Sequence, residues 1–254
     1  MDRYRFTFFG RYDKNKFIFK NNKDEKMIKW TIQHLPLCES TNIEAKSLSP
    51  YHVVIADKQT QGKGRNGRTW ISDNGNLFMS VVLPIPQELS CYSLLAGLSV
   101  AQALPFLSTH IKWPNDILID GKKVAGILLE LTEDTLIIGI GVNILSKPKE
   151  KVLYPVTSLS EWGLTMPAFD FAKKILQNIK NNIQLLEKRG FSYLRQEWLD
   201  YASGVGDMIT VNLPTQRIDG VFIGIDEAGA LILKEQDGQT QTITAGDVFF
   251  TPKE

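Results

Sequence analysis

The sequence has few of the features that mark secreted, membrane-spanning or metal-clustered proteins. Only two cysteines occur, Cys38 and Cys91, without a C-x-x-C spacing, and the three histidines are scattered. We therefore expect free thiols and no zinc site. No run of 18 or more apolar residues exists to cross a bilayer. The first residues alternate charges with aromatics and lack the pattern of a secretory signal. These absences predict a soluble cytoplasmic protein.

The chain also lacks a strong excess of either charge. Its formal net charge of +1 gives no overall attraction to nucleic acid or to an anionic membrane. Residues 1–26 are locally basic, with eight Lys or Arg against four Asp or Glu. Because this segment has neither helical nor strand periodicity, we expect residues 1–27 to form a disordered extension, with Met27 as an alternative start.

Ordered elements begin close to that point. Apolar, β-branched patterns predict strands over residues 52–57, 76–83 and 135–144, and two strands within 111–131 joined by a hairpin turn at Asp120 and Gly121. Helical spacing predicts one helix over 90–107 with Ser90 as its N-cap, and two more over 169–188 and 191–202 separated by Gly190. This order predicts an α+β domain, a mixed sheet with helices on one face.

The character of the chain changes after Gly204. Four short strand patterns with turn signals follow within about fifty residues, at 207–213, 217–226, 229–235 and 239–248. Such spacing is typical of a small SH3-like β-barrel. We therefore expect two folded domains, one over residues 28–203 and the barrel over 204–254.

A glycine-rich loop follows the strand that is predicted over residues 52–57. Residues 62–67 match G-x-G-x-x-G, and Arg68 stands where a P-loop has lysine, but both motifs need a helix directly after the loop and none is predicted. The loop instead carries Lys63, Arg65 and Arg68 on a mobile backbone that an anion can order. Trp70 at its end suits the cover of a ligand, and the alternative is a solvated basic turn.

Taken with its neighbours, this loop resembles that of the biotin–protein ligases. The resemblance rests on G-K-G-R-N-G-R-T-W at 62–70, K-W-P-N-D at 112–116, K-V-A-G-I-L-L-E at 123–130 and G-I-G-V-N at 139–143, preceded by S-T-N at 40–42. The motifs occur in the order of that family. Lys63 departs from the more usual arginine, which matters little if that position acts through its backbone. The resemblance implies a class II synthetase-like catalytic domain before the barrel.

The resemblance also implies a ligase that forms a C–N bond. ATP and Mg²⁺ would activate biotin as biotinyl-5′-AMP, and biotin would then pass to a lysine of the biotin carboxyl carrier protein of a carboxylase. Fewer than 40 residues precede Ser40, with no pair of helices among them, so we expect no DNA-binding domain, no DNA partner and no membrane partner. Monomer and homodimer both stay open.

The family's roles fall on particular residues of this sequence. Lys123 and Arg65 are the expected catalytic cations, because they neutralise the repulsion between a carboxylate and a polyphosphate. Expected biotin-binding residues are Ser40, Thr41, Asn42, Gln59, Lys63, Gly64, Arg65, Lys123 and Gly126. Expected ATP or adenylate-binding residues are Arg68, Trp70, Asn115, Asp116 and Asn143, with Asp116 also a metal ligand.

Several alternatives compete with this interpretation. Ser40 is equally well explained as a helix N-cap, and Trp113 and Pro114 as core and turn. A lipoate–protein ligase or octanoyltransferase shares the catalytic fold, but the sequence has no R-R-x-x-G-G-G segment. A biotin-responsive binding protein without catalysis is the second rival, and the intact Lys123 argues against it.

Overall fold

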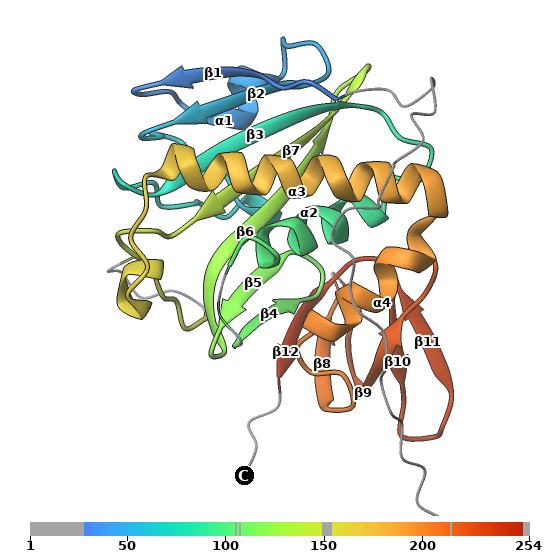
Figure 1. Ribbon diagram of the computed structural model, residues 1–254. Coiled ribbons are helices and arrows are strands. Elements are labelled where there is room, and N and C mark those ends of the chain that lie inside the picture. Colours follow the sequence, from blue (N-terminus) through green and yellow to red (C-terminus); the bar gives the residue numbers. More distant parts are fainter. Residues whose placement is uncertain (1–27, 105, 107, 149–153, 214, 251–254) are drawn as a thin grey trace, which may run out of the picture.

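The structure is a computed structural model, and it describes residues 28–104, 106, 108–148, 154–213 and 215–250. Two sheets organise this part of the chain, a large one in the upper half of Figure 1 and a smaller one below it. The expected extension over residues 1–27 lies outside the described residues. Among the described residues, no helix is long and apolar enough to span a membrane.

The large sheet has seven strands in the order β1-β2-β3-β7-β6-β5-β4. Strands β1 and β2 pair in parallel, whereas the other neighbours are antiparallel, so the sheet is mixed as predicted. Asp120 and Gly121 both have positive φ, which fits the predicted tight turn between β5 and β6. The strands are β1 Thr31–Leu35, β2 His52–Ala56, β3 Leu77–Pro84, β4 Thr109–Lys112, β5 Asp116–Ile119, β6 Lys122–Leu131 and β7 Thr135–Val142.

Helices α2 and α3 cover one face of this sheet, and α4 leads from there to the small sheet (Figure 1). Helix α3 ends and α4 begins at Gly190, whose φ of 75° suits glycine, so the predicted break is confirmed. The helices are α1 Thr41–Ala45, α2 Cys91–Ala101, α3 Ala168–Arg189 and α4 Phe191–Tyr201. There are also two short 3-10 helices, η1 Arg65–Gly67 and η2 Leu159–Trp162.

Ser90 is the N-cap residue of α2, as predicted, but the expected capping contact does not form. Ser90 has helical backbone angles, and its side chain makes no capping hydrogen bond. Its hydroxyl instead donates to the backbone oxygen of Ala228, 2.6 Å away in the C-terminal part of the chain. A partner distant in sequence has therefore taken the place of a local one.

The strand pattern divides the sheet into a packed face and a partly open face. Ile138, Ile140 and Val142 of β7 belong to the main core beneath α2 and α3. Since strand side chains alternate, Gly139 and Gly141 point to the opposite face. The short helix α1 packs there, in a small cluster of Ala45, Val54, Val82 and Ile137. The rest of this face is available for a site.

The second sheet is antiparallel, with five strands in the order β11-β10-β9-β8-β12. This arrangement agrees with the predicted small barrel of short strands. Trp113 is buried in the main core and donates its indole N–H to the oxygen of Gly229 at 3.0 Å, which ties the two sheets together. The strands are β8 Met208–Asn212, β9 Arg217–Ile225, β10 Leu231–Lys234, β11 Thr240–Ile243 and β12 Asp247–Phe250.

Candidate active site

The residues that the sequence singles out, although spread over a hundred positions, line one pocket. It lies on the open face of the large sheet and reaches the small sheet at Asp247 and Val248. The pocket-lining candidates are Ser40, Thr41, Asn42, Gln59, Lys63, Gly64, Arg65, Arg68, Trp70, Asn115, Asp116, Lys123, Gly126 and Asn143. The fold therefore brings together every residue for which a binding or catalytic role is expected.

The floor of the pocket is made of glycines. A Cβ at Gly141 would lie 2.4 Å from Cε2 of Trp70, and one at Gly126 would lie 2.9 Å from Cζ3 of the same ring. A Cβ at Gly139 would lie 2.4 Å from Oδ1 of Asn42. These distances are shorter than any van der Waals contact, so the glycines on β6 and β7 are required for close approach.

One end of the pocket is a network of uncharged polar groups. The backbone N–H of Thr41 donates to Oε1 of Gln59 at 2.7 Å, and Nε2 of Gln59 donates to Oγ of Ser72 at 2.9 Å. The Gln59 amide is therefore held in one orientation. Helix α1 begins directly after Ser40, as predicted, but the Ser40 hydroxyl makes no capping hydrogen bond. Ser40 is buried and lines the pocket.

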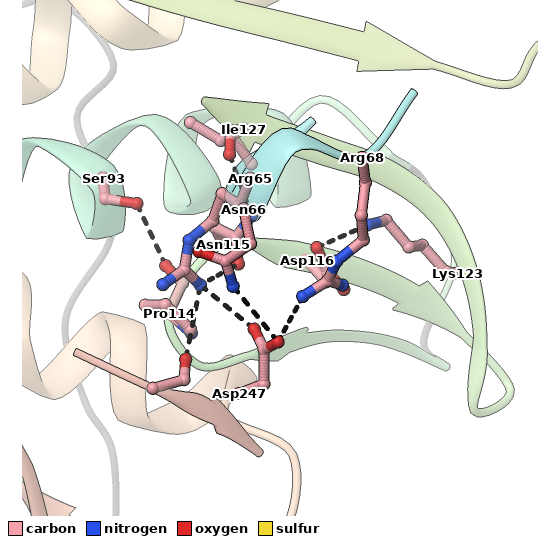
Figure 2. Close-up of polar contacts among 11 residues, drawn as sticks. Arg65, Asn66, Arg68, Ser93, Pro114, Asn115, Asp116, Lys123, Ile127 and Asp247 are labelled. Atoms are coloured by element: carbon pink, nitrogen blue, oxygen red, sulfur yellow. Dashed lines mark hydrogen bonds and ion pairs between the residues drawn. The ribbon is translucent and has the colours of Figure 1, made fainter. Parts of the chain in front are cut away.

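Charged groups occupy the middle of the pocket. Nζ of Lys123 lies 2.7 Å from Oδ1 of Asp116, so the two side chains form an ion pair. The angles of this contact are not those of a hydrogen bond, and Oδ1 accepts none among the described residues. Nη1 of Arg65 donates to Oδ1 of Asn115 at 3.0 Å, and the Asn115 amide donates to the oxygen of Ile127 at 2.9 Å. Figure 2 shows both pairs, Lys123 with Asp116 and Arg65 with Asn115.

A carboxylate of the small sheet holds the glycine-rich loop. Arg68 donates to Asp247, Nη1 of Arg65 lies 3.8 Å from the same carboxylate, and Nδ2 of Asn66 lies 3.4 Å from it (Figure 2). Arg65 also donates to the oxygen of Gly246 at 3.4 Å. Sequence reasoning missed Asp247, because its partners are about 180 residues away and its strand pattern carries no chemical motif.

Lys112, the first residue of K-W-P-N-D, is a second residue that sequence reasoning left without a role. It ends β4, pairs in register with Asp116 and is only 7% exposed in the wall of the pocket. Burial is the largest cause that lowers its pKa from 10.5 to about 8. The carboxylate of Asp116 opposes this shift, and the ammonium of Lys123 adds to it.

Trp70 and Asn143 both face the pocket, but they are held differently. The Trp70 ring lies on the glycine floor, and its indole N–H is buried without a hydrogen-bond partner among the described residues. The Asn143 amide is fixed, since it donates to the oxygen of Thr157 at 3.1 Å. An unsatisfied indole N–H is costly, so the Trp70 position favours a ligand that accepts its hydrogen bond.

Comparison with known proteins agrees with this geometry. Residues 25–143 match the model of the Biotin/lipoate A/B protein ligase family, and residues 205–251 match the Biotin protein ligase C terminal domain. A biotin–[acetyl-CoA-carboxylase] ligase of Paracoccus denitrificans is 35% identical, over 84% of this chain and 97% of that protein. The chain belongs to the biotin protein ligase family.

Other relatives of the enzyme are also ligases of this family. A biotin–[acetyl-CoA-carboxylase] ligase of Mycobacterium tuberculosis is 34% identical, over 77% of each protein. The bifunctional ligase/repressor of Bacillus subtilis is 35% identical over 73% of this chain, which spans 62% of that protein. The match to the C-terminal domain model names biotin alone, which favours biotin over the lipoate alternative.

Solved structures of the family share the fold. The biotin protein ligase of Aquifex aeolicus in complex with biotin and ATP has a TM-score of 0.79 at 29% identity, covering 87% of this chain and 99% of that one. The Leishmania major enzyme in complex with biotinyl-5-AMP has a TM-score of 0.63 at 26% identity, covering 84% and 98%. These likenesses support both the mixed sheet with its helices and the second, smaller sheet.

The pocket can accommodate Mg²⁺, although the described residues contain no group of three or more His, Cys, Asp or Glu side chains that could hold a metal by themselves. Mg²⁺ is usually bound by one or two carboxylates together with substrate phosphates. The carboxylates of Asp116, which pairs with Lys123, and of Asp247, which pairs with Arg68, both line this pocket. The donors therefore fit a cation that arrives with a nucleotide.

Proposed function

We propose that this biotin ligase forms biotinyl-5′-AMP from biotin and ATP in the pocket, and then transfers biotin to a lysine of a biotin carboxyl carrier protein. The observation that carries the proposal is the gathering of the motif residues around one glycine floor, with a polar end beside a cluster of cations. In this proposal residues 28–203 form the catalytic domain, and residues 204–254 contribute Asp247 to its loop.

Biotin would occupy the end of the pocket near helix α1. Its ureido ring offers two donors and one acceptor on an apolar body, which suits a few fixed polar groups in an otherwise apolar pocket. Gln59 is oriented by Thr41 and Ser72, and Ser40, whose hydroxyl does not cap helix α1, lines the same pocket. The Trp70 ring lies on the glycine floor, so it would move aside to make room for the valeryl chain. Proposed biotin ligands are Ser40, Thr41, Asn42, Gln59, Lys63, Gly64, Arg65, Lys123 and Gly126.

Adenylation would occur beside Lys123. A biotin carboxylate oxygen attacks the α-phosphorus of ATP, the bond from that phosphorus to the bridging oxygen breaks, and pyrophosphate leaves. Because a monoanion approaches a polyanion, the repulsion between them must be neutralised. Lys123 pairs with Asp116 in this structure, and its ammonium would contact both anions when they enter the pocket. Arg65 would bind the same oxygens from above. Such preorganised cations stabilise charge that develops in the transition state.

The nucleotide would lie between the loop and the G-I-G-V-N segment. Proposed contacts are Arg68 and Asn115 near the phosphates and Trp70 and Asn143 near the adenosine. Asp116 would hold Mg²⁺, which supplies further neutralisation of the phosphates when bound. The Trp70 ring occupies the floor between β6 and β7, so it would shift when ligands enter and then cover them.

Transfer would follow while the loop stays closed. The lysine amine of the acceptor attacks the carbonyl carbon of biotinyl-AMP, an amide bond forms, the acyl–phosphate bond breaks, and AMP leaves. Acyl-adenylates hydrolyse readily, so exclusion of water protects the intermediate. The link from Arg68 to Asp247 supports this role, because it fixes the loop against the small sheet.

The proposal can be tested by mass spectrometry without an acceptor. Purified enzyme is mixed with ATP, Mg²⁺ and either biotin or lipoate, and acyl-AMP is measured. Biotinyl-AMP alone is the expected product. Lipoyl-AMP alone would assign the chain to lipoate ligation, and biotin binding without adenylate would make it a binding protein. Lys123→Ala should lose most adenylate formation and keep the fold, so a wild-type rate in this variant would refute the role of Lys123.

A further inference from the structure

A continuous row of polar contacts connects the polar end of the pocket with Glu130, near the end of β6. Nδ2 of Asn42 donates to Oε2 of Glu130 at 2.5 Å. Oδ1 of Asn42 lies 2.5 Å from Oγ of Ser80, which in turn lies 2.8 Å from Oγ1 of Thr41. Thr41 Oγ1 lies 3.2 Å from Oε1 of Gln59. Because Asn42, Ser80 and Thr41 are all buried, these groups must satisfy one another without bulk water.

The sheet brings the two ends of this row to one face. Glu130 pairs in register with Ile137, and Ser80 pairs with Gly139. Ile137 packs in the small cluster with helix α1, and residues two apart on a strand share a face. Glu130 and Ser80 therefore both lie on the face of the pocket. A Cβ at Gly139 would lie 2.4 Å from Oδ1 of Asn42, so this glycine makes the space that the Asn42 amide occupies.

The number of hydrogens fixes the direction of each contact. A carboxylate only accepts, so the Asn42 amide must turn its N–H to Glu130 and its oxygen to Ser80. The Gln59 amide turns its oxygen to Thr41, whose backbone N–H donates to it at 2.7 Å. The hydroxyls of Ser80 and Thr41 then supply two hydrogens for three contacts. The contact without a hydrogen is the longest one, at 3.2 Å between Thr41 and Gln59.

Two acceptor oxygens therefore face each other at the polar end of the pocket. Ser80 donates its hydrogen to Asn42, Thr41 donates its own to Ser80, and Oγ1 of Thr41 keeps a lone pair towards Gln59. Thr41 and Gln59 both line the pocket. A ligand N–H placed against both oxygens satisfies them, whereas a ring oxygen adds a third acceptor. The ureido ring of biotin carries two N–H groups, and the disulfide ring of lipoate carries none.

We propose that Glu130 is a positioning residue that makes this end of the pocket select a ligand N–H. It acts through Asn42 and Ser80 on the hydroxyl of Thr41. The inference rests on the proposed binding of biotin at this end. Nζ of Lys46 lies 3.8 Å from Oε1 of Glu130, so the carboxylate is held on its outer side as well.

The direction of the row depends on the carboxylate. In Glu130→Gln the introduced amide can donate to the oxygen of Asn42, and the Asn42 amide can turn over. Asn42 then donates to Ser80, Ser80 to Thr41, and the Thr41 hydroxyl to the oxygen of Gln59. Every contact now has a hydrogen, so the reversed row is favoured and the pair of acceptors is lost.

The test compares biotin with its two cyclic carbamate analogues, in each of which a ring oxygen replaces one ureido N–H. Calorimetry gives the dissociation constant of each ligand with the full-length enzyme in the absence of ATP. Glu130→Gln keeps the shape of the side chain, and Ser80→Ala interrupts the row at its middle. The matched control is Glu133→Gln, which changes an exposed glutamate in the turn after β6.

We expect the wild type to bind biotin about tenfold or more tightly than one of the two carbamates, the range of one hydrogen bond to a buried acceptor. This preference should shrink several-fold in Glu130→Gln and in Ser80→Ala, and it should stay unchanged in Glu133→Gln. The rate of biotinyl-AMP formation at saturating biotin should change less than about twofold in Glu130→Gln, because the reacting groups lie elsewhere in the pocket.

Two results would overturn the inference while leaving the proposed function intact. One is a wild type that binds biotin and both carbamates equally well. The other is an equal weakening of all three ligands in Glu130→Gln, which is what a purely structural role of Glu130 would give. If the wild type binds no biotin, the proposed function itself fails.

Discussion

Replacing Lys112 by methionine should stabilise the protein at neutral pH. The folded state holds the Lys112 ammonium in a wall where it is 7% exposed, and burial lowers its pKa from 10.5 to about 8. A lowered pKa means that the folded state binds this proton more weakly than the unfolded chain does, so the charge opposes folding. Methionine has a similar length and no charge, and it packs well against aromatic rings.

The size of the effect follows from two opposing contributions. The lowered pKa corresponds to on the order of 3 kcal/mol of destabilisation when the group is charged in both states. The ammonium lies 3.9 Å from the ring centre of Tyr154, and this cation–π contact offsets about 1 kcal/mol of the cost. We therefore expect Lys112→Met to raise the free energy of unfolding by about 2 kcal/mol at pH 7, and the melting temperature by roughly 4–8 °C.

The pH dependence distinguishes this explanation from a simple packing effect. The cost of the charge is fully present below pH 8 and fades as the pH rises towards 10.5, where the unfolded lysine also becomes neutral. Urea unfolding at pH 7 and pH 10 should therefore show a stabilisation of Lys112→Met that shrinks at the higher pH. Lys122 is an exposed lysine on β6, so the control Lys122→Met should stay within about 0.5 kcal/mol of the wild type. A destabilised Lys112→Met at pH 7, or a difference that does not depend on pH, would refute the argument.

Three further predictions concern the loop, the floor and the contact between the sheets. Asp247→Asn weakens the contact with Arg68, so biotinyl-AMP should dissociate several-fold faster. Filter binding of the labelled intermediate measures this rate, and an unchanged rate would contradict the proposal that Asp247 holds the glycine-rich loop. Gly141→Ala places a Cβ 2.4 Å from the Trp70 ring, so calorimetry should show biotin affinity reduced about tenfold or more with an unchanged circular dichroism spectrum. Trp113→Phe removes the hydrogen bond to Gly229 and should cost about 1–3 kcal/mol in urea unfolding.

Local patterns in the sequence were enough to predict most elements of the large sheet. The turn at Asp120 and Gly121 needs positive φ, and the break at Gly190 needs a backbone that glycine adopts easily. These requirements act within a few residues, so the sequence alone reveals them. The position of Ser90 before α2 was also predicted, but its capping hydrogen bond does not form, because its hydroxyl donates to the carbonyl of Ala228, 138 residues away. Local capping rules cannot anticipate such a competitor.

In the candidate site, too, some residues could be predicted from the sequence and others could not. Its motif residues could be identified because the family resemblance assigned them, and the pocket gathers them all. Asp247 and Lys112 gained no role from the sequence, since their significance depends on the contact between β12 and the large sheet. Asp247 meets the loop only when the small sheet is in place, and Lys112 meets Phe249 and Phe250 for the same reason.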